Sequence, residues 1–305
     1  MNPSSARSRD LPEARRAELG LLLLVGIWSV NFSVLKVGLD AFAPFAFNAL
    51  RFPLAAAFVT GALLLRGPLP VPDRADLGRV LGLGVLGHVI YQLFFINGMA
   101  LTRAGNGALM LATAPVFTTL LSRVAGHERV PTRAAAGIVA TLAGVALVIG
   151  SGDGPLSFSS ATVAGDLLVM ASAVLWAVYT VGARNVVRKY GALAVMVWTL
   201  WIGATLLVLI GLPDLRRMEP TGPPAWAAVV YAGVLGIGLA QVLWYRGVRL
   251  IGNTRTAVYQ NVVPLGAIAV AWAWLDEVPN LGQLAGAVIV VSGVAAVRTS
   301  MRAAT

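Results

Sequence analysis

The strongest constraint in this sequence is that apolar runs follow one another along nearly its whole length, with only short polar stretches between them. A helix needs about 20 mostly apolar residues to cross the hydrocarbon core of a bilayer. Ten windows meet this requirement, at residues 19–37, 43–65, 80–101, 105–124, 132–150, 165–186, 191–212, 225–246, 255–275 and 280–298. We therefore expect an all-α integral membrane protein with ten transmembrane helices.

The composition supports this expectation and excludes several kinds of functional site. Hydrophobic residues make up 58% of the chain and charged residues 12%, whereas globular domains average about 45–50% and about 25%. Cysteine is absent, which excludes disulfides, thiolate nucleophiles and cysteine-based metal sites. Only two histidines are present, and no acidic residue lies in the middle of an expected span. We expect no catalytic site, no metal site and no cofactor.

The formal charge of +10 predicts an orientation in the membrane. If the N-terminus is cytoplasmic, 18 of the 23 Lys and Arg residues fall in cytoplasmic segments; Lys36, Arg103, Arg216 and Arg217 fall outside, and Arg51 lies within a span. Because Lys and Arg concentrate in cytoplasmic loops, we expect a multi-pass protein of the inner (plasma) membrane with both termini in the cytoplasm. The basic excess then reflects topology, and we expect no nucleic-acid partner.

The second half of the chain repeats the first at a nearly constant offset. An offset of 149 residues relates the GVLG sequence at 84–87 to that at 233–236, and it pairs Gln92 with Gln241, Pro115 with Pro264 and Glu128 with Glu277. An ordered series of this kind indicates an internal duplication. We divide the chain into an N-terminal tail (1–18), a first five-helix repeat (19–150), a connecting loop (151–164), a second five-helix repeat (165–298) and a C-terminal tail (299–305).

Each expected repeat holds an odd number of spans, so the second repeat must cross the membrane in the opposite sense to the first. Inverted-topology repeats are a recurring design of secondary transporters, in which the substrate site lies near the bilayer midplane between the repeats. The sequence therefore favours a transporter. The alternative is a duplicated membrane protein with a structural or enzymatic role.

Several residues also carry a family resemblance. They include Trp28, Asn31-Phe32, Pro44 and Arg51 in the first two spans, Ala114-Pro115, Gly126 and Glu128 further on, and the repeated positions Pro264, Glu277, Gly286 and Gly293. With these residues the sequence resembles the EamA-type family of the drug/metabolite transporter superfamily. The resemblance implies two inverted five-helix bundles around a central cavity, and export of amino acids or other small metabolites.

Polar and aromatic side chains inside the spans mark the candidate substrate site, because such residues are costly unless they face protein or water. On a helix, His88, Tyr91 and Gln92 share one face, as do Gln241 and Trp244. The complete set of expected substrate contacts is Trp28, Asn31, Arg51, His88, Tyr91, Gln92, Trp176, Tyr179, Gln241, Trp244, Tyr259 and Asn261.

Three of the expected features have two interpretations each. Arg51 either binds a substrate carboxylate or pairs with the C-terminal end of a helix. His88 is either a proton acceptor, given its reference pKa near about 6.5, or a core histidine bonded to a neighbouring helix. Pro115 and Pro264 cannot donate a backbone hydrogen bond, so we expect kinks there, which either gate the central space or are static.

We expect a secondary-active or facilitative transporter that exports amino acids or similar small zwitterionic metabolites by alternating access. An exporter of drug-like or aromatic amphiphiles is the alternative, and an intramembrane enzyme acting on lipid-linked substrates is a more distant one. The expected partners are a small-molecule substrate and the lipid bilayer. The oligomeric state stays open, and a monomer is sufficient for this mechanism.

Overall fold

The computed structural model describes residues 3–126, 131–151, 160–252, 256 and 259–303. Within these residues the chain is helical and contains no β-strand. Most of the expected connecting loop and several residues of the expected ninth span, 253–255 and 257–258, lie outside the described residues, as does Glu128.

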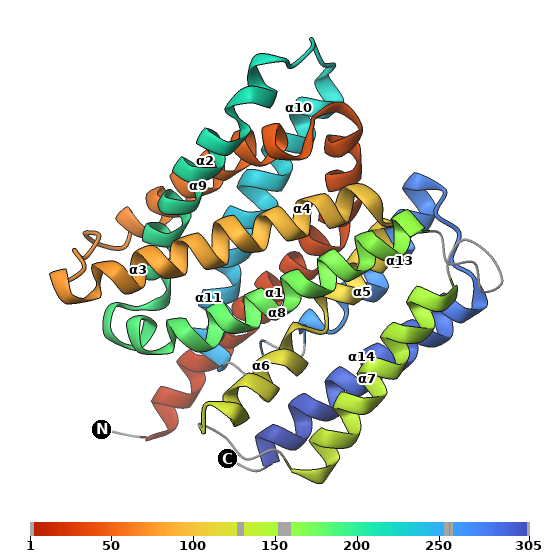
Figure 1. The fold of residues 1–305 in the computed structure, drawn as a ribbon. Helices are drawn as coiled ribbons and strands as arrows, with labels where there is room; N and C mark the ends of the chain where they lie inside the picture. Colours follow the sequence, from red (N-terminus) through yellow and green to blue (C-terminus); the bar gives the residue numbers. More distant parts are fainter. Residues whose placement is uncertain (1–2, 127–130, 152–159, 253–255, 257–258, 304–305) are drawn as a thin grey trace.

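The helices form one bundle, shown in Figure 1. The first half of the chain forms α1 (Pro3–Ala41), α2 (Pro44–Leu64), η1 (Arg74–Asp76), α3 (Leu77–Gly84), η2 (Val85–Ile90), α4 (Tyr91–Leu101), α5 (Ala104–Leu111), α6 (Ala114–Val124) and α7 (Thr132–Ser151). The second half forms α8 (Ser160–Tyr190), α9 (Ala192–Arg216), α10 (Pro223–Val230), η3 (Tyr231–Leu239), α11 (Ala240–Ile251), α13 (Val263–Leu275) and α14 (Leu281–Ala303).

Nine helical segments in the described part of the chain are long and apolar enough to cross a membrane. They coincide with nine of the ten expected windows; the remaining window, 255–275, contains the shorter apolar helix α13. Many large hydrophobic side chains point outward, among them Leu22, Val139, Trp272 and Val288, each more than half exposed. Such a surface suits lipid and not water. The chain is therefore a multi-pass membrane protein.

The first helix is longer than its expected span. Residues 3–18, which the sequence analysis assigns to a tail, continue α1 without interruption. From its apolar part, α1 packs against α5 of its own half and against α10, η3, α11 and α13 of the second half. In return, α8 of the second half packs against α4, α5 and α6 of the first, and α2 packs against α9. The interior of the bundle is thus built from both halves.

The fourth and ninth spans, in which the sequence predicts kinks at Pro115 and Pro264, are interrupted next to these prolines. In the fourth span α5 ends at Leu111 and α6 begins at Ala114; in the ninth, α13 begins at Val263. Both prolines sit in the first turn of the new helix. This position suits proline because the N–H groups of a first helical turn have no intrahelical acceptor. Whether these breaks gate the central space or are static stays a prediction.

The third and eighth spans contain π-helical turns, where the sequence analysis assumes regular α-helix. The turn η2 covers Val85–Ile90, and η3 covers Tyr231–Leu239. At the repeat offset of 149, residues 85–90 correspond to 234–239, so the two turns occupy equivalent positions. Such turns are rare and occur frequently at functional sites.

Helices α7 and α14 lie side by side in Figure 1 and make the most extensive helix contact in the described bundle. Glycines at the contact allow the two helix backbones to approach each other directly, because glycine has no side chain. A Cβ atom added to Gly137 would lie 2.8 Å from the carbonyl oxygen of Gly293, and one added to Gly144 would lie 2.9 Å from that of Gly286. Gly137 and Gly286 are repeat equivalents, as are Gly144 and Gly293, so the contact uses the same positions from both halves.

Polar contacts join the two halves at one end of the bundle. The Glu277 carboxylate accepts hydrogen bonds from the backbone N–H groups of Ala104 (3.1 Å) and Gly105 (3.4 Å), at the start of α5. The buried carboxylate of Asp166 accepts hydrogen bonds from the Thr102 hydroxyl and from Asn106 Nδ2. These contacts hold α4 and α5 of the first half against α8 and α13 of the second.

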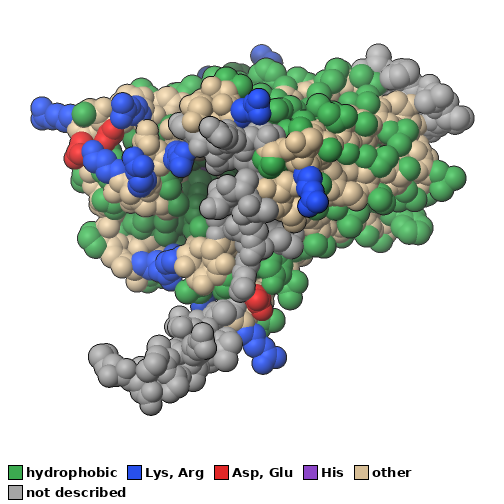
Figure 2. All heavy atoms as spheres, turned by 90° about the horizontal axis from the view of Figure 1, so that it is seen from below, with side chains coloured by type: hydrophobic (Ala, Val, Ile, Leu, Met, Phe, Trp, Pro, Cys, Tyr) green, Lys and Arg blue, Asp and Glu red, His purple; other side chains and the backbone are tan. Residues whose placement is uncertain are grey.

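Basic side chains gather toward the opposite end. In Figure 2, most of the visible Lys and Arg side chains lie toward the left of the molecule, and hydrophobic side chains dominate to the right. At this basic end Lys189 contacts both Asp73 (2.5 Å) and Asp76 (2.7 Å), which joins the end of α8 to the segment before α3.

Candidate functional site

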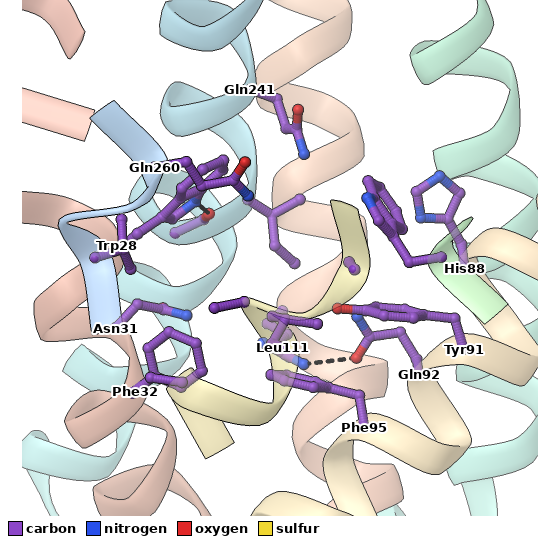
Figure 3. Close-up of a pocket in the computed structure, with 18 of the residues that line it drawn as sticks. Trp28, Asn31, Phe32, His88, Tyr91, Gln92, Phe95, Leu111, Gln241 and Gln260 are labelled. Carbon is purple, nitrogen blue, oxygen red and sulfur yellow. Dashed lines mark hydrogen bonds between the residues drawn. The ribbon is translucent and has the colours of Figure 1, made fainter. Parts of the chain in front are cut away.

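A cavity of about 170 Å³ lies in the interior, where helices of both halves meet. Its lining comes from α1, α2, η2, α4, α5 and α6 of the first half, and from α8, α9, η3, α11 and α13 of the second. Figure 3 shows side chains of both halves around it. An engineered apolar cavity of about 150 Å³ accepts benzene, so this space is large enough for a small organic molecule.

Most of the expected site residues line this cavity. They are Trp28, Asn31, Arg51, His88, Tyr91, Gln92, Trp176, Gln241 and Pro264. The clearest agreement concerns His88, Tyr91 and Gln92, which reach the same space although His88 stands in the π-helical turn and the other two in α4.

Five expected residues do not line the cavity. The Tyr179 ring lies one layer behind its wall, 5.0 Å from the Trp176 ring and 5.7 Å from that of His88 between centroids. Trp244 packs behind Trp28, with ring centroids 5.9 Å apart. Pro115, in the first turn of α6, does not line the cavity.

The remaining two expected residues, Tyr259 and Asn261, flank Gln260, which does line the cavity. Tyr259 packs beside the apolar part of α1, and the Asn261 side chain accepts a hydrogen bond of 2.7 Å from Arg298. Gln260, between them, lines the cavity. Because the helix is interrupted after Gln260, regular helical spacing does not identify which of the three faces inward.

Among the described residues that line the cavity, Arg51 is the only formally charged side chain, apart from what His88 can carry. It is 1% exposed, and its guanidinium carbon lies 5.2 Å from the centre of the Phe47 ring and 5.5 Å from that of Phe52. Its Nη2 donates to Asn48 Oδ1 (2.8 Å) and to Gln92 Oε1 (2.9 Å), and its Nε donates to Asn48 as well. These contacts fix the guanidinium, and none of them is with a helix C-terminus.

His88 is bonded across to the second half. Its Nε2 lies 3.1 Å from the Thr199 hydroxyl, which itself donates to the carbonyl oxygen of Val195 (2.9 Å). Which of the two groups donates in the bond between His88 and Thr199 depends on the imidazole tautomer. His88 therefore ties η2 to α9 and presents one face to the cavity.

Aromatic rings form much of the remaining wall. The Tyr91 ring stacks on Phe95 with a centroid separation of 5.7 Å and lies 5.3 Å from the Trp176 ring. In Figure 3 the Tyr91 hydroxyl points into the space. On the opposite side, Trp28 Nε1 donates to the Gly236 carbonyl oxygen in η3 (3.0 Å).

Sequence reasoning missed the apolar part of the lining. Phe32, Phe52, Phe95, Leu111, Met196 and Ile237 border the cavity beside the polar residues. Within spans that are apolar throughout, such residues carry no signal that separates cavity from lipid or core. In the described part of the chain, no group of three His, Asp or Glu side chains is placed to hold a metal ion.

The arrangement of two related halves around a lined cavity agrees with the comparisons with known proteins. The model of the EamA-like transporter family matches residues 15–150 and again residues 163–299. The chain belongs to the EamA-like transporter family. Its two family matches also show that it contains two EamA-like repeats.

Curated relatives of this EamA-family protein are named as transporters. The chain is 28% identical over 275 residues to the "Uncharacterized transporter YdfC" of Bacillus subtilis, covering 89% of this chain and 87% of that protein. It is 30% identical over 282 residues to the "Probable terminal-alkyne amino-acid exporter" of Streptantibioticus cattleyicolor, covering 92% of each. The fold is also that of a solved crystal structure, with a TM-score of 0.69 at 24% identity over 95% of this chain and 98% of the other.

Proposed function

We propose that this EamA-family transporter exports amino acids or similar small zwitterionic metabolites, and that the cavity is its substrate site. The observation that carries the proposal is the composition of the lining, which combines Arg51 and three glutamines with aromatic rings from both halves. Arg51 supplies a donor for a carboxylate. The aromatic faces of Trp28 and Trp176 suit an ammonium group or an apolar side chain. The name of the Streptantibioticus relative supports the same substrate class.

Alternating access follows from the repeats in this proposal. With five spans in each repeat the halves have opposite orientations, and rocking of one half against the other exposes the midplane site to each side in turn. The distribution of Lys and Arg, at the basic end seen in Figure 2, supports cytoplasmic termini in an inner (plasma) membrane. Transport is then either coupled to an ion gradient or facilitative.

A second candidate function is the export of aromatic amphiphiles. It is favoured by the six aromatic side chains that border the cavity: Trp28, Phe32, Phe52, Tyr91, Phe95 and Trp176. Competition separates the two candidates, because saturable inhibition of transport by unlabelled amino acids is expected only for the first.

Counterflow in proteoliposomes tests the proposal. Vesicles containing the purified protein are preloaded with one unlabelled amino acid, and entry of the same labelled amino acid at trace concentration is followed against protein-free vesicles. We expect transient accumulation for a subset of amino acids, and its loss in a His88→Ala/Trp176→Ala variant, because both residues line the cavity.

The control is Val71→Ala, a change at an exposed residue outside the cavity lining, which should leave counterflow unchanged. Accumulation that persists in the double variant would keep the transport function but remove the cavity as its site. Absence of counterflow for all amino acids, from protein with a cooperative unfolding transition, would contradict the amino-acid assignment.

A further inference from the structure

The cavity holds a fixed positive charge whose contacts are all neutral. Arg51 donates to the amide oxygens of Asn48 and Gln92, and no acidic side chain among the described residues pairs with it. Its Nη1 has no hydrogen-bond partner in the described part of the chain. A buried charge is costly unless it is paired and hydrogen-bonded. The site is therefore electrostatically incomplete, and an anionic group is what would complete it.

Two amides of the cavity lining are held by arginines through their oxygen atoms. Gln92 Oε1 accepts from Arg51 Nη2 (2.9 Å), and Gln260 Oε1 accepts from Arg298 Nη2 (3.0 Å). Since the oxygen and nitrogen of an amide point in different directions, a held oxygen turns the NH₂ group away from its arginine. In Figure 3 the amide nitrogens of Asn31 and Gln260 point toward the middle of the cavity.

The Asn31 side chain also presents its amide NH₂ group to the cavity, in this case because of packing. Its Oδ1 is buried without a hydrogen-bond partner and lies against Gly236, which leaves Nδ2 for the cavity. Donors therefore converge on the space from α1, α2, α4 and the segment before α13. A carboxylate is acceptor-only and offers about four lone-pair sites, so it matches this set better than an amide or a hydroxyl.

No equivalent set exists for an ammonium group. None of the lining residues in the described part of the chain is an Asp or Glu. An ammonium would have the aromatic faces and neutral acceptors such as the Tyr91 hydroxyl. A carboxylate instead has the full charge of Arg51. The lining thus distinguishes the two ends of a zwitterion, and only one end meets an opposite charge.

We propose that the cavity selects monocarboxylates with an apolar body, that Arg51 binds the carboxylate, and that an amino group on the substrate is dispensable. This inference rests on the proposed function, because the bound solute is then the transported one. It narrows the substrate class to solutes recognised through their carboxylate, with the ring or alkyl body against Trp28, Phe95 and Trp176.

Three related solutes separate the contributions of the two charged groups: L-phenylalanine, 3-phenylpropanoate, which lacks the amine, and L-phenylalaninamide, which lacks the carboxylate. The readout is the thermal unfolding midpoint of the full chain in detergent, since a ligand that binds only the folded state raises it. We expect both carboxylates to raise the midpoint and the amide, at equal concentration, to leave it unchanged. A shift by the amide as large as that by 3-phenylpropanoate, or no shift by either carboxylate, would overturn the proposal.

A substitution that keeps the contacts of Arg51 tests its role without removing a buried partner. In Gln92→Glu the carboxylate oxygen takes the place of the amide oxygen that Arg51 already contacts, so the guanidinium gains a counter-ion and should keep its position. We expect the affinity for 3-phenylpropanoate to fall about tenfold or more, while the unfolding midpoint without ligand does not fall. Unchanged affinity would show that Arg51 does not bind the carboxylate.

Asn97→Asp is the matched control. Asn97 lies on the same helix, α4, and bonds only to the Leu93 carbonyl oxygen without lining the cavity. The same amide-to-acid change there should leave the affinity for 3-phenylpropanoate unaltered, and an equal loss of affinity in this variant would also overturn the proposal.

Binding and transport give separate outcomes. Midpoint shifts by both carboxylates without any counterflow would contradict the transport function and leave the carboxylate site in place. Counterflow driven equally by L-phenylalanine and its amide would contradict the carboxylate site and leave the transport function in place.

Discussion

The indole Nε1 of Trp28 donates a hydrogen bond of 3.0 Å to the carbonyl oxygen of Gly236. Trp28 belongs to the first repeat and Gly236 to the second, and both line the cavity. This bond fixes α1 against the π-helical turn η3 at the cavity wall. The position of Trp28 and of Asn31, one turn further along α1, thus depends on how closely the backbone of η3 approaches.

Gly236→Ala tests this dependence. A Cβ atom at position 236 would overlap Asn31 Oδ1, so α1 and η3 must separate or Asn31 must turn. Overpacking of this kind costs about 1–3 kcal/mol, and we expect at least about a tenfold loss of substrate affinity. The measurement is the concentration dependence of counterflow. Gly82→Ala is the control, because nothing lies within 4 Å of the added Cβ; equal behaviour of the two variants would contradict the account.

The contact between α7 and α14 should be the position at which added volume most affects stability. In Gly144→Val the new side chain would meet the backbone of Gly286 and the Val290 side chain. We expect a loss of about 1–3 kcal/mol in the free energy of unfolding, measured by denaturant titration in micelles. Gly150→Ala, on the same helix with open space around the added Cβ, should cost nothing or stabilise slightly. A tolerated valine at 144 would mean that the two helices do not pack closely.

The bond between His88 and Thr199 predicts different outcomes for two similar substitutions. Thr199→Val removes the hydroxyl and leaves His88 Nε2 without its hydrogen-bond partner in a buried setting. An unsatisfied buried group costs about 1–3 kcal/mol, so the free energy of unfolding should fall by this amount in Thr199→Val. Thr199→Ser keeps the hydroxyl, so its free energy of unfolding should stay close to that of the natural chain. Equal stabilities of the two variants would exclude the bond as a determinant of the fold.

The basic end carries the one pH effect that we predict. The Lys189 ammonium holds the pKa of the exposed Asp73 carboxyl below its ordinary value, chiefly through their hydrogen bond. A carboxyl whose pKa is lower in the folded than in the unfolded state stabilises the fold above the unfolded pKa, and this contribution disappears as the pH falls through the folded pKa. The midpoint difference between the natural chain and Asp73→Asn should thus be constant near about pH 7 and shrink below about pH 4. A difference that grows on acidification would contradict the sign.

Much of the bundle could be predicted because the physics of lipid leaves a clear signal in the sequence. Long apolar windows identify the helices, and polar residues such as Gln92 and Gln241 stand out within them because they are costly in lipid. Their repeat relationship then indicates that two halves share one site. By this reasoning the sequence alone predicts that Arg51, His88 and Trp176 lie in the interior.

The remaining features depend on backbone geometry that hydropathy does not encode. The π-helical turn η2 changes the angular spacing around His88. The helix break before Pro264 means that regular helical spacing does not predict that Gln260 lines the cavity while Asn261 bonds to Arg298. Tyr179 and Trp244 share a helical face with lining residues, yet they end one layer behind the wall because large neighbouring rings occupy the space in front. Packing distance, and not helical periodicity, separates these two groups.

The central claim is that the cavity is a substrate site open to each side of the membrane in turn. The natural absence of cysteine allows a direct test with Ala112→Cys, a small change in the cavity lining. In sealed vesicles, a membrane-impermeant thiol reagent applied from either side should label this position, and solutes that show counterflow should slow the labelling. Val71→Cys, in an exposed segment, should react from one side only and without protection. Labelling of position 112 from one side only, or labelling that transported solutes do not slow, would contradict the account.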